Sequence, residues 1–427
     1  MRTRGGIFEL RVSDLSVYVF TIILLALECS LFFLDIIPTS FFRISSYTSK
    51  YLISAIILVG TFFTLTITRN KSNYIFAIPI LAFSTMCLII TIASSVFYHS
   101  SISRIFLTAL PYITVPLLYF VLHDITQDEH MYIFFIKTFI AFALIYAIFC
   151  ILQSFGFAVM NTEYQNLSMR AGRIRLLMSG DFITFGALIT LGKIYSSEKS
   201  RAIYSRAIYI TLFAIMLFEL FWVAQTRIEL IGLSVCVISG FILKAKRPAL
   251  RIMLVLLISL LLFSQFSETI STAFFPSKTD VSSFARLNAY EYYWSHAMDM
   301  GFFGLGYIPE MFSQGMFGLV WYGNTARGDI TDIGVIGYLA RYGICGAIVL
   351  ALGIVWLVRA IIRRNKKHFI LDANPEAWMA LVHLIVVSPT ISFTDVQRIF
   401  YLPIVGLLIE HALVSPSIRN STTDKRV

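Results

Sequence analysis

The sequence predicts an all-α, polytopic transmembrane bundle of about twelve spans, with one long loop outside the membrane. Three observations support this fold class. Of the 427 residues, 58% are hydrophobic and only 14% are charged, well outside the range of soluble chains. Apolar runs that are long enough to cross a bilayer, or nearly so, recur along the whole chain. The basic residues gather in the short segments between these runs.

The apolar runs define the domain organisation, because each approaches the roughly 20 residues that a membrane-crossing helix needs. They cover residues 17–37, 51–68, 74–98, 105–122, 131–156, 176–195, 207–225, 228–243, 250–266, 333–362, 377–393 and 399–414. The predicted units are nine spans in 1–266, a long loop in 267–331, three spans in 332–414 and a tail in 415–427. The five cysteines all fall within apolar runs without metal-ligand spacing, which predicts packing roles and no disulfide.

The loop charges predict the orientation of the chain. If the N-terminus is cytoplasmic, the Lys/Arg clusters fall in the cytoplasmic loops, as the positive-inside rule requires. These clusters are Arg2, Arg4 and Arg11; Arg69 and Lys71; Lys199, Arg201 and Arg206; Lys244, Lys246, Arg247 and Arg251; Arg359, Arg363, Arg364, Lys366 and Lys367; and Arg419, Lys425 and Arg426. Both termini are then cytoplasmic and loop 267–331 is outside. The net charge of +10 comes from these juxtamembrane clusters, so no nucleic-acid partner is expected.

A set of arginines on the predicted outer side breaks this pattern. They are Arg170, Arg173, Arg175, Arg227, Arg286, Arg327 and Arg398. Each can pair with a structural acid or a lipid headgroup. Arginine, unlike lysine, can also bind a phosphate or carboxylate group in a bidentate manner, through two parallel hydrogen bonds. For the stretch "MRAGRIR" (169–175), Arg227 at a tight hairpin and Arg286 taken together, an anionic ligand is the favoured interpretation.

The long loop contains one stretch with helical spacing, residues 283–300, which the glycines between 301 and 306 bring to an end. Arg286, Tyr290, Tyr293 and Trp294 are expected to share a face of this helix. An aromatic face can pack against protein, stack on sugar rings or lie at the level of lipid headgroups. The sequence leaves these three roles open.

The tenth predicted span, "TDIGVIGYLARYGICGAIV" (331–349), begins with a carboxylate and carries a guanidinium two turns further in. Asp332 is either a functional group, acting as a base or orienting an acceptor, or a structural group, acting as a helix cap or as the partner of an arginine. Arg341 is expected deeper in the span, paired with a buried acid for which Glu28 and Glu219 are the candidates.

Four local patterns occur in order along the chain and together resemble the O-antigen polymerase and ligase superfamily of bacterial membrane glycosyltransferases (Wzy and WaaL type). They are "GRIRLLMSGDFITFGALI" (172–189), "AQTRIELIGL" (224–233), "ARLNAYEYYWSHAMDMGFFGLGY" (285–307) and the stretch 331–349 quoted above. The third contains the family pattern of an arginine, a later tryptophan and Gly-x-Gly, matched by Arg286, Trp294 and Gly304-Leu305-Gly306. The fourth places Asp332 eleven residues before Gly343, where the family has a polar catalytic residue.

The resemblance implies a GT-C-like enzyme of the bacterial inner membrane that joins undecaprenyl-diphosphate-linked oligosaccharides at the periplasmic face, as in O-antigen, capsule or exopolysaccharide synthesis. The polymerase branch is favoured because the ligase branch usually has histidine in place of Asp332. The implied partners are the lipid-linked glycan, membrane lipids and a chain-length regulator protein, with no cofactor and no metal. The implied catalytic residues are Asp332, Arg286 and Arg227. The implied substrate-binding residues are Arg170, Arg173, Arg175, Tyr290 and Trp294.

Two other functions are compatible with the same sequence. One is an O-antigen ligase, which transfers the finished glycan to the lipid A core. The other is a lipid-linked oligosaccharide flippase or secondary transporter, since twelve spans with intramembrane charges are ordinary for that class. Many transporters consist of two related halves with matched broken helices, and no such internal repeat is visible here.

Overall fold

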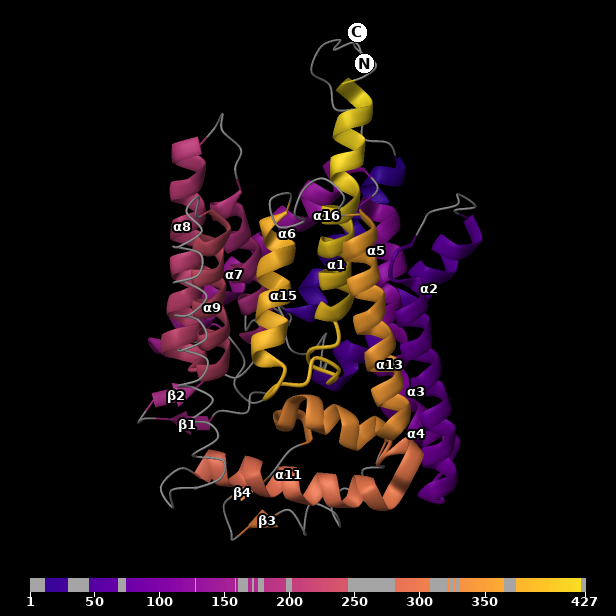
Figure 1. Ribbon diagram of the computed structural model, residues 1–427. Coiled ribbons are helices and arrows are strands. Elements are labelled where there is room, and N and C mark those ends of the chain that lie inside the picture. Colours follow the sequence, from indigo (N-terminus) through magenta and orange to yellow (C-terminus); the bar gives the residue numbers. More distant parts are fainter. Residues whose placement is uncertain are drawn as a thin grey trace.

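The computed structural model describes residues 12–29, 46–67, 74–126, 128–157, 159, 168–170, 173–175, 180–196, 202–244, 281–307, 321–322, 326–327, 330–364 and 374–423. Most of these residues form a bundle of antiparallel helices (Figure 1). The helices are α1 (Val12–Glu28), α2 (Ser46–Ile67), α3 (Ala77–Phe97), α4 (Ile102–Thr114), α5 (Leu118–Thr126), α6 (Glu129–Ser154), α7 (Gly180–Tyr195), α8 (Ala202–Glu219), α9 (Arg227–Lys244), α11 (Val281–Met300), α13 (Gly334–Arg364), α15 (Pro375–Val387) and α16 (Tyr401–Thr423).

Short elements complete the described part of the chain. They are the turns η2 (Val115–Leu117), η4 (Leu220–Ala224, a π-helical turn), η5 (Gly301–Phe303) and η7 (Ile330–Ile333). Strands β1 (Ser168–Arg170) and β2 (Arg173–Arg175) form one antiparallel ladder, and β3 (Trp321–Tyr322) and β4 (Ala326–Arg327) form another. Helix α1 begins, and α16 ends, at the same end of the bundle (Figure 1). We call the opposite end, where β1, β2 and α11 lie, the distal end.

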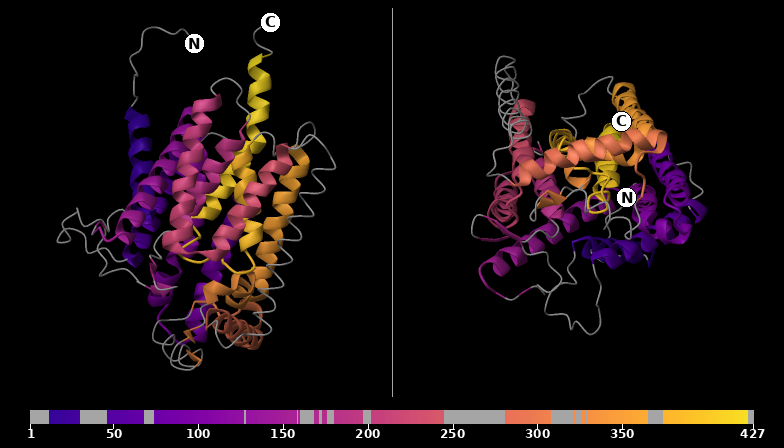
Figure 2. Two further views of the ribbon diagram at one scale, coloured as in Figure 1. Left: turned by 90° about the vertical axis from the view of Figure 1, so that its left-hand side faces the viewer. Right: turned by 90° about the horizontal axis from the view of Figure 1, so that it is seen from below.

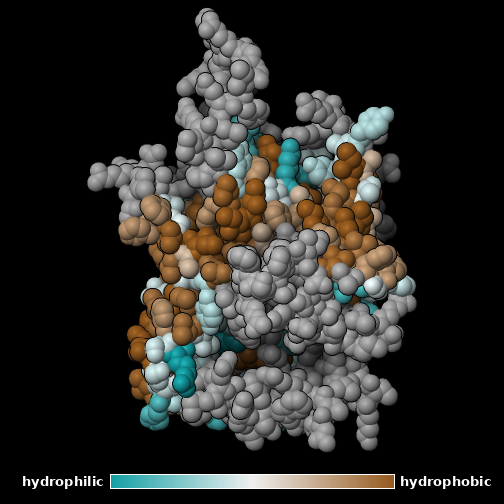
Figure 3. Space-filling model, turned by 180° about the vertical axis from the view of Figure 1, so that it is seen from behind, coloured by the Kyte–Doolittle hydropathy of each residue, from teal (hydrophilic) through white to brown (hydrophobic). Residues whose placement is uncertain are grey.

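The helices confirm the coarse prediction of a polytopic helical membrane protein. Five of the described helices are long and apolar enough to cross a membrane: Ala77–Phe97, Ile102–His123, Glu129–Ser154, Tyr204–Ala224 and Gly334–Ile362. Figure 3 shows hydrophobic side chains gathered over the middle of the back of the bundle. Helices also occupy the other predicted runs that fall on described residues, whereas run 250–266 lies outside them. The count of twelve spans stays a prediction.

The core of the bundle lies around α7, whose residues from Phe182 to Gly192 are all buried. Phe182 stacks on Phe139 of α6 and Phe185 stacks on Tyr401 of α16, each with ring centroids 4.4 Å apart. Small residues let neighbouring helices approach closely, since a methyl group on Gly192 would meet the backbone of α15 at 2.6 Å. This packing fixes the direction of α7 and therefore the place of the residues at its distal end.

The tenth predicted span is not one straight helix, and this corrects the sequence interpretation. Helix α13 bends at Gly343, which has φ 58° and ψ −148°. Its first part lies across the distal end, above α11, and only the second part runs along the bundle (Figure 1). Figure 2 shows α11 crossing the same end when the molecule is seen from below. The two crossing segments pack through Ala289 and Tyr293 of α11 and Ala340 of α13.

Candidate functional site

The four sequence patterns come together at the distal end although they are far apart in the chain. Strand β2 packs against η4, the turn that leads into α9. Helix α11 packs against α13, η7 and β4, and η5 packs against α13. Figure 1 shows these elements below the bundle, with the start of α11 on the side of β1 and β2. The predicted site residues therefore belong to one region of the molecule.

The arginine-rich pattern forms the β1–β2 hairpin. Arg170 pairs with Arg173, and Ser168 pairs with Arg175, in the antiparallel register. The hairpin lies between α6 and α7 in the chain and ends just before Gly180, the first residue of α7. The backbone thus carries three arginines at the distal end, while their side chains lie outside the described part of the structure.

The second pattern places Arg227 at the first position of α9, with its side chain exposed. The α8–α9 connection is tight because η4 ends at Gln225, which has the left-handed conformation (φ 51°). The first turn of a helix presents unpaired N–H groups and the positive end of the helix dipole. Arg227 therefore lies at a position where two sources of positive potential coincide.

The aromatic face predicted for α11 is divided in the structure. The Tyr290 hydroxyl donates to the Pro389 carbonyl at 3.1 Å, and Tyr293 is only 4% exposed. Trp294 is 43% exposed. The prediction that Tyr293 and Trp294 share one face is wrong, because consecutive residues point about 100° apart around a helix and the contact with α13 covers only one of them. Arg286 lies one turn before Tyr290 on the same helix, with its side chain outside the described part.

The Gly-x-Gly pattern fits into the bend of α13. The Leu305 and Gly306 N–H groups donate to the Ala340 and Arg341 carbonyls at 2.9 and 2.8 Å, which satisfies carbonyls that the bend leaves without helical partners. Gly304 has φ +63°, and a methyl group on it would lie 2.6 Å from Gly343 N. The family-like glycines therefore have a structural explanation, since they allow two backbone segments to touch.

Asp332 lies in η7 at the distal end, with an exposed side chain. Ile333 occupies the position directly before α13. The backbone of η7 is held from the α15–α16 connection: the Val335 N–H donates to the Ser388 carbonyl at 3.0 Å, and Gly334 packs closely against Ser388. This places Asp332 beside the segment that also receives the Tyr290 hydrogen bond.

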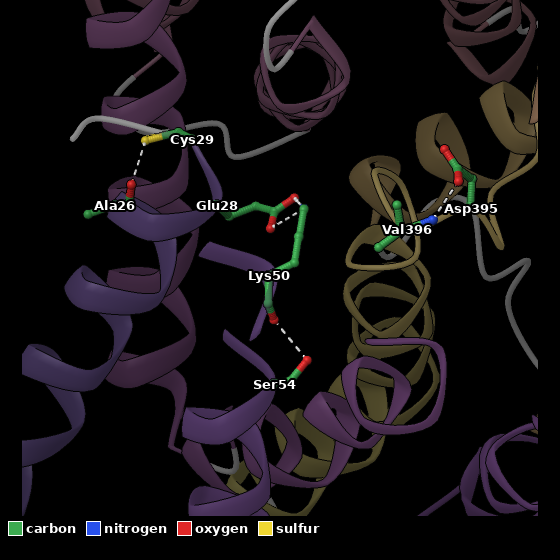
Figure 4. A network of polar contacts seen from close by, with 7 residues as sticks. All are labelled: Ala26, Glu28, Cys29, Lys50, Ser54, Asp395 and Val396. Atoms are coloured by element: carbon green, nitrogen blue, oxygen red, sulfur yellow. Dashed lines mark hydrogen bonds and ion pairs between the residues drawn. The ribbon is translucent and has the colours of Figure 1, made fainter. Parts of the chain in front are cut away.

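The predicted partner of Arg341 is wrong. An Nη atom of Arg341 donates to the Tyr112 hydroxyl at 2.8 Å, and the guanidinium lies 5.2 Å from the centre of the Tyr112 ring. Glu28 instead forms an ion pair with Lys50 at 2.7 Å, which joins α1 to α2 (Figure 4). Because α13 bends at Gly343, Arg341 remains at the distal end and does not enter the bundle along a straight span.

Sequence reasoning missed a cluster of buried charges at the distal ends of α7, α9 and α15, which we call the distal network. It consists of Asp181, Glu229, His383, Asp395 and Arg398. Arg398 pairs with Asp181 at 3.1 Å and with Asp395 at 3.5 Å, and His383 Nε2 lies 2.9 Å from Glu229 Oε2. Asp395 also accepts the Val396 N–H at 2.7 Å (Figure 4).

The distal network stabilises the positive charge of Arg398. Burial alone lowers the pKa of a guanidinium, but the adjacent carboxyl groups of Asp181 and Asp395 outweigh it and raise the pKa of Arg398. The sequence did single out Arg398 as an arginine on the predicted outer side, but it did not identify the acids that pair with it. Ionisable residues inside apolar runs were the only signal that could have identified Asp181 and His383.

The chain matches no protein-family model, no curated protein and no solved structure. In the ranges that the structure describes, no three His, Cys, Asp or Glu side chains are grouped so that they could hold a metal ion. None of the cysteines at 29, 87, 150, 236 and 345, all of which the structure describes, takes part in a disulfide.

Proposed function

We propose that this protein is a polymerase of undecaprenyl-diphosphate-linked oligosaccharide repeat units. One observation carries the proposal: the four segments that resemble the polymerase and ligase superfamily meet at one end of the bundle. Alternation of the spans already places these segments on one side of the membrane; the structure adds that β2 packs against η4 and that α11 packs against α13 and η7. A site built from several segments at one end is what a reaction on a membrane-anchored substrate requires.

The proposed reaction joins two lipid-linked glycans. The oxygen of an acceptor sugar hydroxyl forms a bond to the anomeric carbon of the donor, and the bond from that carbon to the diphosphate breaks. Its electron pair stays on the leaving diphosphate, whose growing charge must be stabilised. Arginines supply that stabilisation through their charge and through bidentate hydrogen bonds. Arg173, Arg175, Arg227 and Arg286 are the residues we assign to this role, with Arg170 beside them.

Asp332 is the group that we assign to the acceptor hydroxyl, as its base or its hydrogen-bond partner. Its exposure at the distal end supports this role. Tyr290 and Trp294 are assigned to sugar contacts, and the exposed ring of Trp294 is the better placed of the two for stacking. The distal end is then the periplasmic face of the bacterial inner membrane, with both termini in the cytoplasm, as the loop charges predict.

Two alternatives remain distinct in what they require. A ligase needs lipid A core as acceptor, and the presence of Asp332 instead of histidine favours the polymerase. The distal network is the observation that favours a transporter, because buried acids, His and Arg also form proton pathways in transporters. It lies at one end of the bundle, however, and not midway along the helices, where transporter sites are usual.

Reconstitution separates these functions. The purified protein is placed in vesicles with single lipid-linked repeat units extracted from cells that lack this chain. A ladder of longer glycans, formed with release of undecaprenyl diphosphate and without any added nucleotide, is the expected result. Movement of the units across the vesicle membrane without elongation would identify a transporter. Transfer that occurs only after lipid A core is added would identify a ligase.

A further inference from the structure

The α15–α16 connection, residues 388–400, lies at the distal end next to the crossing part of α13 (Figure 1). Its first residues hold two other elements in place. The Ser388 carbonyl accepts the Val335 N–H of α13 at 3.0 Å. The Pro389 carbonyl accepts the Tyr290 hydroxyl of α11 at 3.1 Å. This part of the connection is therefore fixed to the elements that carry the assigned acceptor and sugar contacts.

The last part of the same connection holds the start of α7. Arg398 Nε donates to Asp181 Oδ1 at 3.1 Å, and Asp181 is the second residue of α7. The same guanidinium pairs with Asp395, inside the connection, at 3.5 Å. Arg175, the last residue of β2, precedes Asp181 by six residues. The Arg398–Asp181 pair, which we call the distal ion pair, thus joins the connection to the segment that leads out of the arginine hairpin.

The connection is closed by hydrogen bonds of its own between these two ends. The Ile391 N–H donates to the Val387 carbonyl at 2.9 Å. The Ile399 N–H donates to the Asp395 carbonyl at 2.8 Å. Ile391 and Phe393 are buried in the core of the bundle. A segment that is bonded and packed in this way transmits position, since neither end moves without breaking these contacts.

The distal ion pair is a costly way to join two elements. The side chains of Arg398 and Asp181 are only 14% and 17% exposed, so both ions lose much of their hydration. An apolar contact would join α7 to the connection without that loss. A buried ion pair is best explained where one arrangement has to be specified, because its charged groups meet only in a narrow range of positions.

We propose that Arg398 is a positioning residue that sets the distance between the diphosphate-binding arginines and Asp332, a role that rests on the proposed function. Arg398 acts through Asp181 and does not touch the substrate. It fixes the start of α7 against a connection whose other end holds α13, so that the donor diphosphate and the acceptor hydroxyl meet in a reactive geometry. A misplacement of about 1 Å between reacting groups lowers a rate on the order of 10²-fold.

The chain contains a matched control at the other end of the same helix. Lys193, in the last turn of α7, pairs with Glu376 of α15 at 2.6 Å. Glu376 is the second residue of α15, as Asp181 is of α7, and both acids bind a cation. Asp181→Ala breaks the distal ion pair while Arg398 keeps Asp395 as a partner, and Arg398→Gln breaks it from the other side. We call these two the distal variants, and Glu376→Ala is their control.

Electron paramagnetic resonance tests the positioning without substrate. Nitroxide labels are attached through Met169→Cys in β1 and Met298→Cys on the exposed side of α11, in reconstituted protein that also carries Cys345→Ala. The other four cysteines are buried. We expect one narrow distance distribution in the parent chain and in the Glu376→Ala control, and a broader or shifted one in both distal variants. An unchanged distribution in the distal variants, or an equal change in the control, overturns the proposal.

Kinetics then test the effect on the reaction. The distal variants should elongate with a kcat lower on the order of 10²-fold and a nearly unchanged KM, because the groups that bind the lipid-linked unit are still present. Arg398→Lys, which keeps a cation beside Asp181, should give an intermediate kcat, and Glu376→Ala should match the wild type per folded molecule. A wild-type kcat in both distal variants refutes the role.

The two measurements separate this proposal from the proposed function. If the wild type does not elongate at all, the proposed function fails. The label distances still decide whether the distal ion pair fixes the hairpin against α11 and α13. If the wild type elongates and the label distances do not respond to the distal variants, only the positioning role of Arg398 fails.

Discussion

Two buried polar clusters at opposite ends of the bundle differ in how well their groups are satisfied. At the end where α1 begins, the Glu410 carboxylate accepts hydrogen bonds from the Tyr119 hydroxyl at 2.5 Å and the Ile75 N–H at 3.1 Å. His123 Nδ1 lies 3.1 Å from the same carboxylate. Each acceptor oxygen therefore has a donor, and the cluster ties α16 to α5 and to the start of α3.

The distal network has the opposite character, because its carboxyl groups outnumber its cations. Asp181 and Asp395 share Arg398, and the buried carboxyl group of Glu229 lies beside His383. A satisfied cluster stabilises a fold and has no reason to react. An excess of acids retained in a buried place costs stability and is typical of sites where protons or charges move. We therefore expect mutations in the two clusters to affect different properties.

The largest effect should come from the backbone contact that shapes the distal end. Gly343→Ala places a side chain on a conformation that only glycine adopts readily, at a cost of about 1–3 kcal/mol. The new methyl group also meets the Phe302 carbonyl and Gly304 N, which adds about 1–3 kcal/mol of overpacking. We expect little folded protein by size-exclusion chromatography in detergent. Gly353→Ala, in the same helix with no atom nearby, is the control and should fold normally.

The next effect concerns function without stability. Asp332→Asn keeps the size of the side chain but cannot accept a proton at neutral pH, so elongation should slow on the order of 10²-fold if Asp332 is a base. Arg227→Lys keeps the charge but loses the bidentate contact with the diphosphate, and should also lower the elongation rate. Both side chains are exposed, so thermal unfolding should remain at the wild-type temperature. Wild-type elongation by Asp332→Asn rejects its catalytic role, and Glu291 and Asp329 become the next candidates for the base.

The third effect concerns stability without function, the reverse of the second. Glu410→Gln removes the charge from hydrogen bonds that tie three helices together, and should lower the free energy of unfolding by about 1.5–3 kcal/mol. The elongation rate per folded molecule should not change. Glu291→Gln, which removes an exposed carboxyl group from α11, is the stability control and should leave unfolding unaffected. Loss of activity in Glu410→Gln with normal stability would end the distinction between the two clusters.

The helices and the turns that end them could be predicted from the sequence, because they depend mainly on residues close to one another in the chain. The apolar runs located the helices, and the glycines after residue 300 ended α11 as expected. Gln225 and its neighbours gave the tight connection before Arg227. The pairings were not predictable, because Tyr112 and Arg341, or Asp181 and Arg398, meet only through long-range packing. The bend at Gly343 could not be predicted for the same reason. A glycine in an apolar run does not by itself indicate a bend, and the segment that packs against Gly343, which contains Gly304, is distant in the chain.

The smallest effect tests whether Arg341 and Tyr112 only stabilise the distal end or also take part in the reaction. Tyr112→Phe removes the hydroxyl that accepts from Arg341 and keeps the ring beneath the guanidinium. A hydrogen bond from a charged donor contributes about 1.5–3 kcal/mol, and the low end is expected here because the ring contact is kept, so thermal unfolding should shift slightly downward while elongation stays normal. Arg341→Lys should give a similar shift. In the double variant the two losses should not add, because both remove the same interaction. Fully additive losses would show that this hydrogen bond contributes nothing to stability. A slower elongation rate at unchanged stability would instead assign Arg341 to the substrate site. The carboxyl group of Asp395 is close enough to stabilise the charge of Arg341.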